Sequence, residues 1–278
     1  MSNKNIKLIA LDLDGTTLTS QNTLSSRTKE VIKKAVAGGI EVVVASGRPF
    51  GSMPNSILEI KGINYVVSSN GAAIHDAQRQ CIYQSILDER DVLKILELTA
   101  QYDLIFEAFI NGLTYTDLRY VNNPMKYGDN EAYIDYVKAS HGHIEDMRAF
   151  IFEHRLELDS LEIVCADKEL REHIWQKCAE CLNGVYITSS STNFIEFMSI
   201  NATKANAVKR ICNLLDIDTA NICACGNADN DADMIALAGL GAAVGNASPR
   251  CLEYADVVVA SNNDDGVAEL IDYIMCEN

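Results

Sequence analysis

The chain has 278 residues, enough for a large buried core and for two domains. Its formal net charge of -16 argues against binding to nucleic acids or to anionic membranes, because both partners require a basic surface. No apolar run approaches the ~20 residues that a membrane-spanning helix needs. The N-terminus runs straight into the first predicted strand, which leaves no room for a signal peptide.

Nine cysteines, an odd number, are scattered along the chain, several of them in apolar stretches. This usage is typical of reduced thiols in a cytoplasmic protein and does not indicate a disulfide framework. Cys178 and Cys181 have the spacing of some metal and redox sites, but they fall in a predicted helix with no second pair at a zinc-site spacing. We therefore expect a cytoplasmic protein in which this pair has a structural role.

The first predicted element is a strand over residues 6–13, an apolar run that looks buried on both faces. It ends in Asp12 and Asp14, and Gly15 then breaks the strand. Two carboxylates at positions i and i+2 point to the same side, where they can share a metal ion or divide nucleophilic and acid–base work. An ordinary Asp-Gly turn is the alternative, but the complete string D-x-D-G-T after a hydrophobic strand predicts a phosphotransfer site.

The next elements alternate between helix and strand. A predicted helix over residues 25–38 is followed by predicted strands over residues 41–45 and 65–67. Such alternation predicts a parallel sheet, in which ligands bind outside the carboxyl ends of the strands. Polar loops follow all three strands at these ends and are expected to share one site: Asp12 and Asp14, Ser46-Gly47-Arg48, and Asn70-Gly71.

From about residue 84 the pattern changes to a mixture of helical and alternating segments. The predicted helices cover residues 88–102, 129–140 and 167–181, and the predicted strands cover residues 104–109, 161–165 and 185–188. We interpret residues 84–189 as an inserted α+β domain.

The α/β pattern resumes with a predicted strand over residues 194–198 and a helix that begins at Lys204. A buried strand over residues 222–225 then ends in the polar, acidic loop of residues 226–231. The predicted fold is therefore α/β. It has a doubly wound parallel-sheet core of Rossmann-like type, formed by residues 1–83 and 190–278, with the α+β domain inserted between them.

Taken in order, these loops resemble the motifs of the haloacid dehalogenase (HAD) superfamily, and more closely those of its Cof-type subfamily (IIB) of phosphatases. The four motifs match the string from Asp12 to Leu18, Ser46-Gly47-Arg48, Lys204, and residues 226–231. The subfamily's Asn-Gly pair appears as Asn70-Gly71, and its late signatures appear at residues 243–247 and 265–268. The resemblance covers the whole chain and implies a HAD core with an inserted cap domain of the C2B type.

The resemblance also implies a role for each motif. Asp12 is the nucleophile that forms an aspartyl-phosphate, and Asp14 is the general acid and base. The Asp12 carboxylate and the Asp14 backbone carbonyl bind Mg²⁺, a hard cation that prefers oxygen ligands. Ser46 and Lys204 bind the phosphoryl group, and Lys204 also neutralises charge on Asp12. A lysine at a helix start supports this role, because that end of the helix dipole disfavours cations unless an anion is near.

Two further loop positions have two interpretations each. Arg48, which follows Gly47 in the phosphate-binding loop, either contacts the phosphate or braces the loop. Asn70 is either a substrate contact or a turn residue, and Gly71 beside it is a further candidate substrate contact.

One position departs from the family pattern. The fourth motif normally reads Gly-Asp-x-x-Asn-Asp, and its first Asp is a metal ligand, whereas this chain has Asn227 there. An amide oxygen can coordinate Mg²⁺ but brings no negative charge, so we expect a lower metal affinity. Asp229 is a candidate to compensate, directly or through a water. Asn230 and Asp231 keep their expected positions around the metal.

The resemblance thus implies an Mg²⁺-dependent phosphatase that hydrolyses a small phosphomonoester, such as a sugar phosphate, through a phospho-aspartate intermediate. Two alternatives use the same motifs: a phosphate-binding protein with little turnover, which Asn227 favours, and a phosphomutase. The chain has no glycine-rich dinucleotide loop and no basic stripe. The expected partner is therefore a small phosphorylated metabolite, and not a nucleic acid or a membrane.

Overall fold

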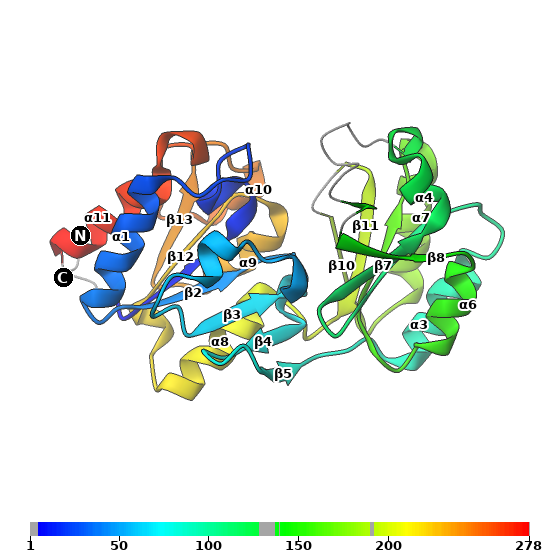
Figure 1. Ribbon diagram of the computed structural model, residues 1–278, viewed down its shortest axis with the longest axis horizontal. Coiled ribbons are helices and arrows are strands. Elements are labelled where there is room, and N and C mark those ends of the chain that lie inside the picture. The colour runs from blue at the N-terminus through cyan, green and yellow to red at the C-terminus, as the bar shows by residue number, and fades with distance from the viewer. Residues whose placement is uncertain (1–4, 128–136, 139, 190–191, 278) are drawn as a thin grey trace. The chain divides into compact units, whose positions relative to one another are not determined.

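The computed structural model of the chain describes residues 5–127, 137–138, 140–189 and 192–277 (Figure 1). The chain divides into two compact units. The core unit comprises residues 1–48, 53–83 and 203–278, and the inserted unit comprises residues 49–52 and 84–202. Each unit has its own sheet.

The core unit is built on an eight-stranded sheet with the order β14-β13-β12-β1-β2-β3-β4-β5. Neighbouring strands from β14 to β3 are parallel, and β4 pairs with β3 in antiparallel fashion. The strands are β1 (Leu8–Leu11), β2 (Glu41–Ala45), β3 (Tyr65–Ser68), β4 (Ala73–His75), β5 (Cys81–Gln84), β12 (Ile222–Gly226), β13 (Leu240–Val244) and β14 (Val257–Val259).

Helices cover both faces of this sheet, with α8 on one face and α1 with α11 on the other (Figure 1). The helices are α1 (Ser26–Ala37), α2 (Asn55–Leu58), α8 (Lys204–Leu215), α9 (Ala232–Leu237), α10 (Pro249–Tyr254) and α11 (Gly266–Glu277). Because both faces are covered, the central strands β1 and β12 are buried at every position, which explains their continuous apolar sequences.

The prediction of a doubly wound α/β core is confirmed. The antiparallel strand β4 and the edge strand β5 were not predicted. They extend the sheet beyond β3, and β5 is short and mostly exposed, as is usual for an edge.

The inserted unit contains a six-stranded sheet with the order β10-β11-β9-β6-β7-β8. Its strands are β6 (Ile105–Ile110), β7 (Leu113–Asp117), β8 (His141–Ile144), β9 (Leu158–Val164), β10 (Val185–Thr188) and β11 (Phe194–Ser199). Its helices are α3 (Glu89–Leu98), α4 (Leu118–Asn122), α6 (Met147–Glu153) and α7 (Lys168–Cys181). One hydrophobic cluster joins α3, α6 and α7 to a face of this sheet.

The predicted boundary at residue 190 lies outside the described residues, and the structure places the unit boundary after Ala202. β11 (Phe194–Ser199), which we assigned to the core, pairs with β9 and β10 in the inserted unit. An alternating apolar strand suits either sheet, so its pattern does not identify its partners. The last segment of the core unit therefore begins at Thr203.

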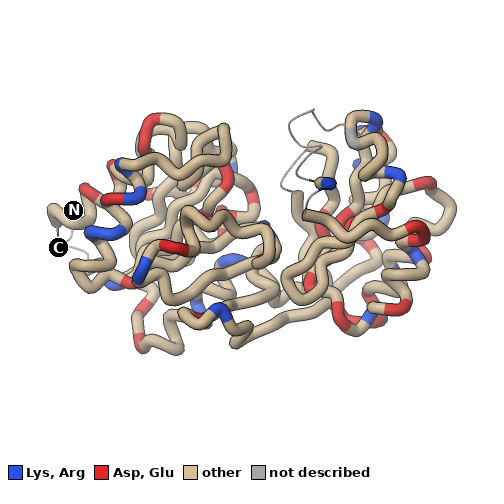
Figure 2. Tube along the Cα trace, viewed as in Figure 1, with Lys and Arg blue, Asp and Glu red and all other residues tan. Residues whose placement is uncertain are grey.

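Most of the helix predicted over residues 129–140 lies outside the described residues. The Cys178–Cys181 pair lies on α7, and all nine cysteines are free thiols. Across the described part of the chain, none of the helices has the length and apolar character needed to cross a membrane. Acidic and basic residues are interspersed along both units in the view of Figure 2.

Candidate active site

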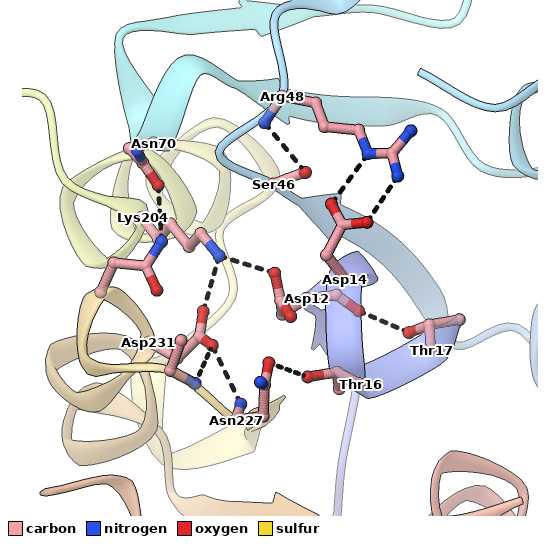
Figure 3. A network of polar contacts seen from close by, with 12 residues as sticks. Asp12, Asp14, Thr16, Thr17, Ser46, Arg48, Asn70, Lys204, Asn227 and Asp231 are labelled. Atoms are coloured by element: carbon pink, nitrogen blue, oxygen red, sulfur yellow. Dashed lines mark hydrogen bonds and ion pairs between the residues drawn. The ribbon is translucent and has the colours of Figure 1, made fainter. Parts of the chain in front are cut away.

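Polar residues from four neighbouring parallel strands meet at one edge of the core sheet (Figure 3). The carboxyl ends of parallel strands lie at the same edge, and α8 begins beside them. The residues brought together there are Asp12 and Asp14 after β1, Ser46 after β2, Asn70 after β3, Asn227 and Asp231 after β12, and Lys204 at the start of α8.

Lys204 joins two carboxylates in the interior of this group. Its side-chain Nζ donates a hydrogen bond to Asp12 Oδ1 and another to Asp231 Oδ1, each at 2.7 Å. Only 2% of Lys204 and 4% of Asp12 are exposed, and Asp231 is fully buried. A buried ammonium needs such partners, because an isolated charge away from water is strongly unfavourable.

Burial raises the pKa of the Asp12 carboxyl and the charge of Asp231 raises it further, while contact with Lys204 lowers it; the resulting pKa is about 7. Burial lowers the pKa of Lys204, but Asp12 and Asp231 outweigh this and hold it above its ordinary value. Two carboxylates thus share one ammonium. A further cation beside Asp12 would favour the ionised carboxylate.

Asp231 also fixes the loop that follows β12. Its Oδ2 accepts hydrogen bonds from the backbone N–H groups of Asn227 and Ala228, both at 3.0 Å. The same side chain therefore positions Lys204 through one oxygen and the loop through the other. These hydrogen bonds satisfy both oxygens of the Asp231 carboxylate, which is fully buried in the loop after β12.

The turn over Leu13–Thr17 explains why glycine and threonine occupy their positions in the D-x-D-G-T string. Gly15 has a φ of 74°, in the left-handed region that favours glycine. Thr17 Oγ1 donates to the Asp12 backbone oxygen at 2.5 Å and closes the turn. The turn is also held from outside, because Asn246 Nδ2 donates to the Gly15 backbone oxygen at 2.8 Å.

Arg48 binds the carboxylate of Asp14 with two prongs. Its Nε donates to Asp14 Oδ2 at 2.8 Å, and its Nη2 donates to Asp14 Oδ1 at 2.5 Å (Figure 3). This geometry fixes the orientation of the carboxylate as well as balancing its charge. The Asp14 side chain is 45% exposed, so the pair faces solvent and is open to a ligand.

The loops after β2 and β3 support one another. Ser46 is buried, and its Oγ accepts a hydrogen bond from the Arg48 N–H at 3.1 Å. Asn230 Nδ2 donates to Asn70 Oδ1 at 2.8 Å and connects this region to the loop after β12. A Cβ at Gly47 would lie 3.1 Å from the same Asn70 oxygen, so glycine leaves room for the amide.

Gly71 lets the loop after β3 approach the start of α8. It has a φ of 104°, and a Cβ there would lie 2.2 Å from the backbone oxygen of Thr203. This close approach brings the backbone of the loop against the residue that caps the helix of Lys204. Gly71 thus has a packing role.

One end of the Asn227 side-chain amide faces both Asp12 and Asp14. With the amide oxygen at this end, Oδ1 accepts from Thr16 Oγ1 at 2.9 Å. With the amide nitrogen there, its two hydrogens have three acceptors in reach: Asp12 Oδ2 at 3.1 Å, the Asp14 backbone oxygen at 2.8 Å and Thr16 Oγ1 at 2.9 Å. When the oxygen is turned inward, one carboxylate and two carbonyl oxygens converge, a set of ligands that suits a hard cation such as Mg²⁺.

This set explains why acidic side chains alone do not reveal the site. Within the residues that the structure describes, no group of three or more His, Cys, Asp or Glu side chains is placed to hold a metal ion. Asp229 turns outward, where its Oδ1 accepts from Ser248 Oγ at 2.7 Å. Its carboxylate is thereby directed to the surface at α10, and the idea that it compensates directly for Asn227 gains no support.

Two residues of the site had no role in the sequence analysis. Thr16 contacts Asn227, and Asn246 braces the turn at Gly15. Thr16 lies in the motif from Asp12 to Leu18, and Asn246 lies in the late signature at residues 243–247. Their places in these motifs were the only indication in the sequence that they belong to the site.

Comparison with known proteins places this geometry in a family. A family model described as haloacid dehalogenase-like hydrolase matches residues 9–271. Phosphatase YwpJ from Bacillus subtilis is 30% identical over 97% of this chain and 100% of its own. A putative phosphatase from Haemophilus influenzae is 32% identical over 96% and 97%. A solved haloacid dehalogenase-like hydrolase from B. subtilis has a TM-score of 0.81 and 29% identity, covering 96% of this chain and 99% of that one.

The chain belongs to the haloacid dehalogenase-like hydrolase family. The predicted resemblance is confirmed, and the chain is a hydrolase.

Proposed function

We propose that the chain is an Mg²⁺-dependent phosphatase that hydrolyses a small phosphomonoester, such as a sugar phosphate, through a phospho-Asp12 intermediate. The observation that carries this proposal is the buried Asp12 carboxylate, which is bonded to Lys204 and lies at the same strand end as Asp14. A buried carboxylate contributes little to the stability of a core, so its presence indicates a functional role. At the edge of the sheet it is well placed to attack an electrophile.

Three oxygens are the candidate protein ligands of the metal: a carboxylate oxygen of Asp12, the backbone carbonyl of Asp14 and the side-chain oxygen of Asn227. When bound there, Mg²⁺ would neutralise charge on the phosphoryl oxygens. Its charge would also favour the ionised form of Asp12, whose pKa is otherwise raised to about 7.

In the first step, an oxygen of Asp12 forms a bond to phosphorus, and the bond from phosphorus to the ester oxygen breaks. Asp14 in its protonated form gives its proton to the departing oxygen, so the product leaves as a neutral alcohol. Lys204 and the Ser46 hydroxyl stabilise the charge on the phosphoryl oxygens. The Ser46 oxygen accepts from the Arg48 N–H, which leaves its own hydrogen available for this purpose.

In the second step, a water oxygen attacks phosphorus and the bond from phosphorus to Asp12 breaks. Asp14, now a carboxylate, accepts a proton from that water. Inorganic phosphate is released, and Asp12 and Asp14 return to their starting states. The two-pronged contact with Arg48 fits the ionised carboxylate of Asp14 and orients it for this second proton transfer.

The substrate class follows from charge and chemistry. The core motifs recognise only the phosphoryl group, and the net charge of -16 disfavours polyanionic partners. We therefore favour a small phosphorylated metabolite. A phosphate-binding protein with little turnover is the second candidate, and Asn227 favours it because an amide brings no charge to the metal site.

The test is a screen of phosphate release from a panel of phosphorylated metabolites, with and without Mg²⁺. We expect Mg²⁺-dependent release from one or more sugar phosphates. Activity confined to phosphopeptides or polynucleotides would overturn the substrate class. No release across the whole panel would favour the binding protein.

A further inference from the structure

The side chain of Asn227 has the same three neighbours in both orientations of its amide. The inward end lies 3.1 Å from Asp12 Oδ2, 2.8 Å from the Asp14 backbone oxygen and 2.9 Å from Thr16 Oγ1. Amide nitrogen and oxygen are nearly equal in size, so turning the group exchanges a donor for an acceptor without moving the backbone. The two orientations therefore differ in chemistry and not in packing.

Without a cation, these neighbours require the nitrogen to face inward. The Asp12 carboxylate and the Asp14 carbonyl are both acceptors, and an inward amide oxygen would meet them with no hydrogen between. The inward NH₂ group supplies one hydrogen to each. An inward amide oxygen would instead face the Asp12 carboxylate oxygen at 3.1 Å and the Asp14 carbonyl at 2.8 Å, so the orientation with the nitrogen inward is the favoured one.

With a cation bound, the same distances suit the opposite orientation. Ligands in octahedral Mg²⁺ sites lie about 2.0–2.1 Å from the ion, so adjacent ligand oxygens are about 2.8–3.0 Å apart. The distances of 3.1 Å and 2.8 Å from the inward end of Asn227 to the Asp12 and Asp14 oxygens fall close to this range. Only the amide oxygen can act as a ligand there.

The surroundings tolerate both orientations. The Thr16 hydroxyl donates to an inward amide oxygen at 2.9 Å. Beside an inward nitrogen it shares the two amide hydrogens with Asp12 and Asp14, because the NH₂ group has only two to give. On the outward side, a Cβ at Gly15 would lie 2.7 Å from the other end of the amide, and glycine leaves that space open.

We propose that the Asn227 amide is a cation-dependent switch, whose NH₂ group bonds Asp12 and Asp14 in the metal-free protein and whose oxygen replaces it when Mg²⁺ binds. This inference rests on the metal site of the proposed function and adds a second conformational state to it. An aspartate at the same position has no hydrogen to donate and leaves three oxygens in contact in the metal-free protein. Asn227 thus stabilises the empty site, and metal binding must displace two hydrogen bonds.

The experiment follows the side-chain NH₂ signals of the ¹⁵N-labelled full chain during titration with Mg²⁺ alone, with binding measured separately by calorimetry. The Asn227→Asp variant identifies the Asn227 signal by its loss. Asn262 is the matched control, because its buried Nδ2 donates to the Leu18 backbone oxygen at 2.9 Å and lies outside the proposed ligand set.

In the metal-free protein we expect the Asn227 NH₂ hydrogens to exchange with solvent as slowly as those of Asn262. Mg²⁺ should accelerate exchange at Asn227 at least tenfold and leave Asn262 unchanged, and Asn227→Asp should bind Mg²⁺ at least threefold more tightly. Mg²⁺ binding with an unchanged Asn227 signal, or with equal affinity in the variant, would overturn the switch and the role of Asn227 as a ligand, but not the role of Asp12 as the nucleophile. No Mg²⁺ binding by calorimetry would overturn both the switch and the metal site of the proposed function.

Discussion

The contact between Arg48 and Asp14 bears on the two interpretations of Arg48. The sequence left Arg48 as either a phosphate contact or a brace. In the structure its guanidinium donates hydrogen bonds to both carboxylate oxygens of Asp14, from Nε at 2.8 Å and from Nη2 at 2.5 Å. An arginine placed in this way orients the proposed acid and base, and a lysine would not reproduce the two-pronged geometry.

We therefore predict that Arg48→Lys lowers kcat about tenfold and changes KM little, because the charge stays while the orientation of Asp14 is lost. Steady-state kinetics with a substrate from the metabolite panel measures both constants. Arg250→Lys is the matched control, since Arg250 pairs with Asp233 on the exposed surface at 3.3 Å. A large rise in KM at constant kcat would instead identify Arg48 as a phosphate contact.

At the scale of elements, the contact between the loop after β3 and the start of α8 positions Lys204. Gly71 allows this contact, since a Cβ there would collide with the Thr203 backbone oxygen at 2.2 Å. Its φ of 104° is a second reason for glycine. Gly39 has a φ of 86°, and a Cβ built there would have no atom within 4 Å. It therefore shares with Gly71 the left-handed backbone conformation but not the close contact.

This pair of glycines makes a matched prediction. Gly39→Ala should cost about 1 kcal/mol of unfolding free energy, from the backbone alone. Gly71→Ala should cost at least about 2 kcal/mol more, because the loop and the helix must separate. Denaturant unfolding of both variants measures the difference. Equal losses would show that the approach of the loop to α8 contributes nothing beyond the conformation of Gly71.

In the molecule as a whole, the features that could be predicted from the sequence are those that depend on neighbouring residues, such as the strands and the polar loops at their ends. Strand ends marked by Asp12, Ser46 and Asn70 identified the edge of the sheet, because a buried parallel strand that ends in polar residues has a distinctive pattern. The partners of β11 (Phe194–Ser199) were assigned wrongly, since alternation defines a strand and not its neighbours. The sequence analysis assigned the Asp14 carbonyl and Asn227 to one metal site, but it did not predict the hydrogen bond between them, because a contact to a backbone carbonyl leaves no pattern in the sequence.

Trapping the phosphoenzyme tests whether Asp12 is the nucleophile. A ³²P-labelled substrate from the panel is mixed with the enzyme and Mg²⁺, quenched in acid within one turnover, and the labelled peptide is mapped. We predict label on the peptide that contains Asp12, and neither label nor turnover in Asp12→Asn, with the fold of that variant unchanged by circular dichroism. Normal hydrolysis by Asp12→Asn, or label on another residue, would show that Asp12 is not the nucleophile.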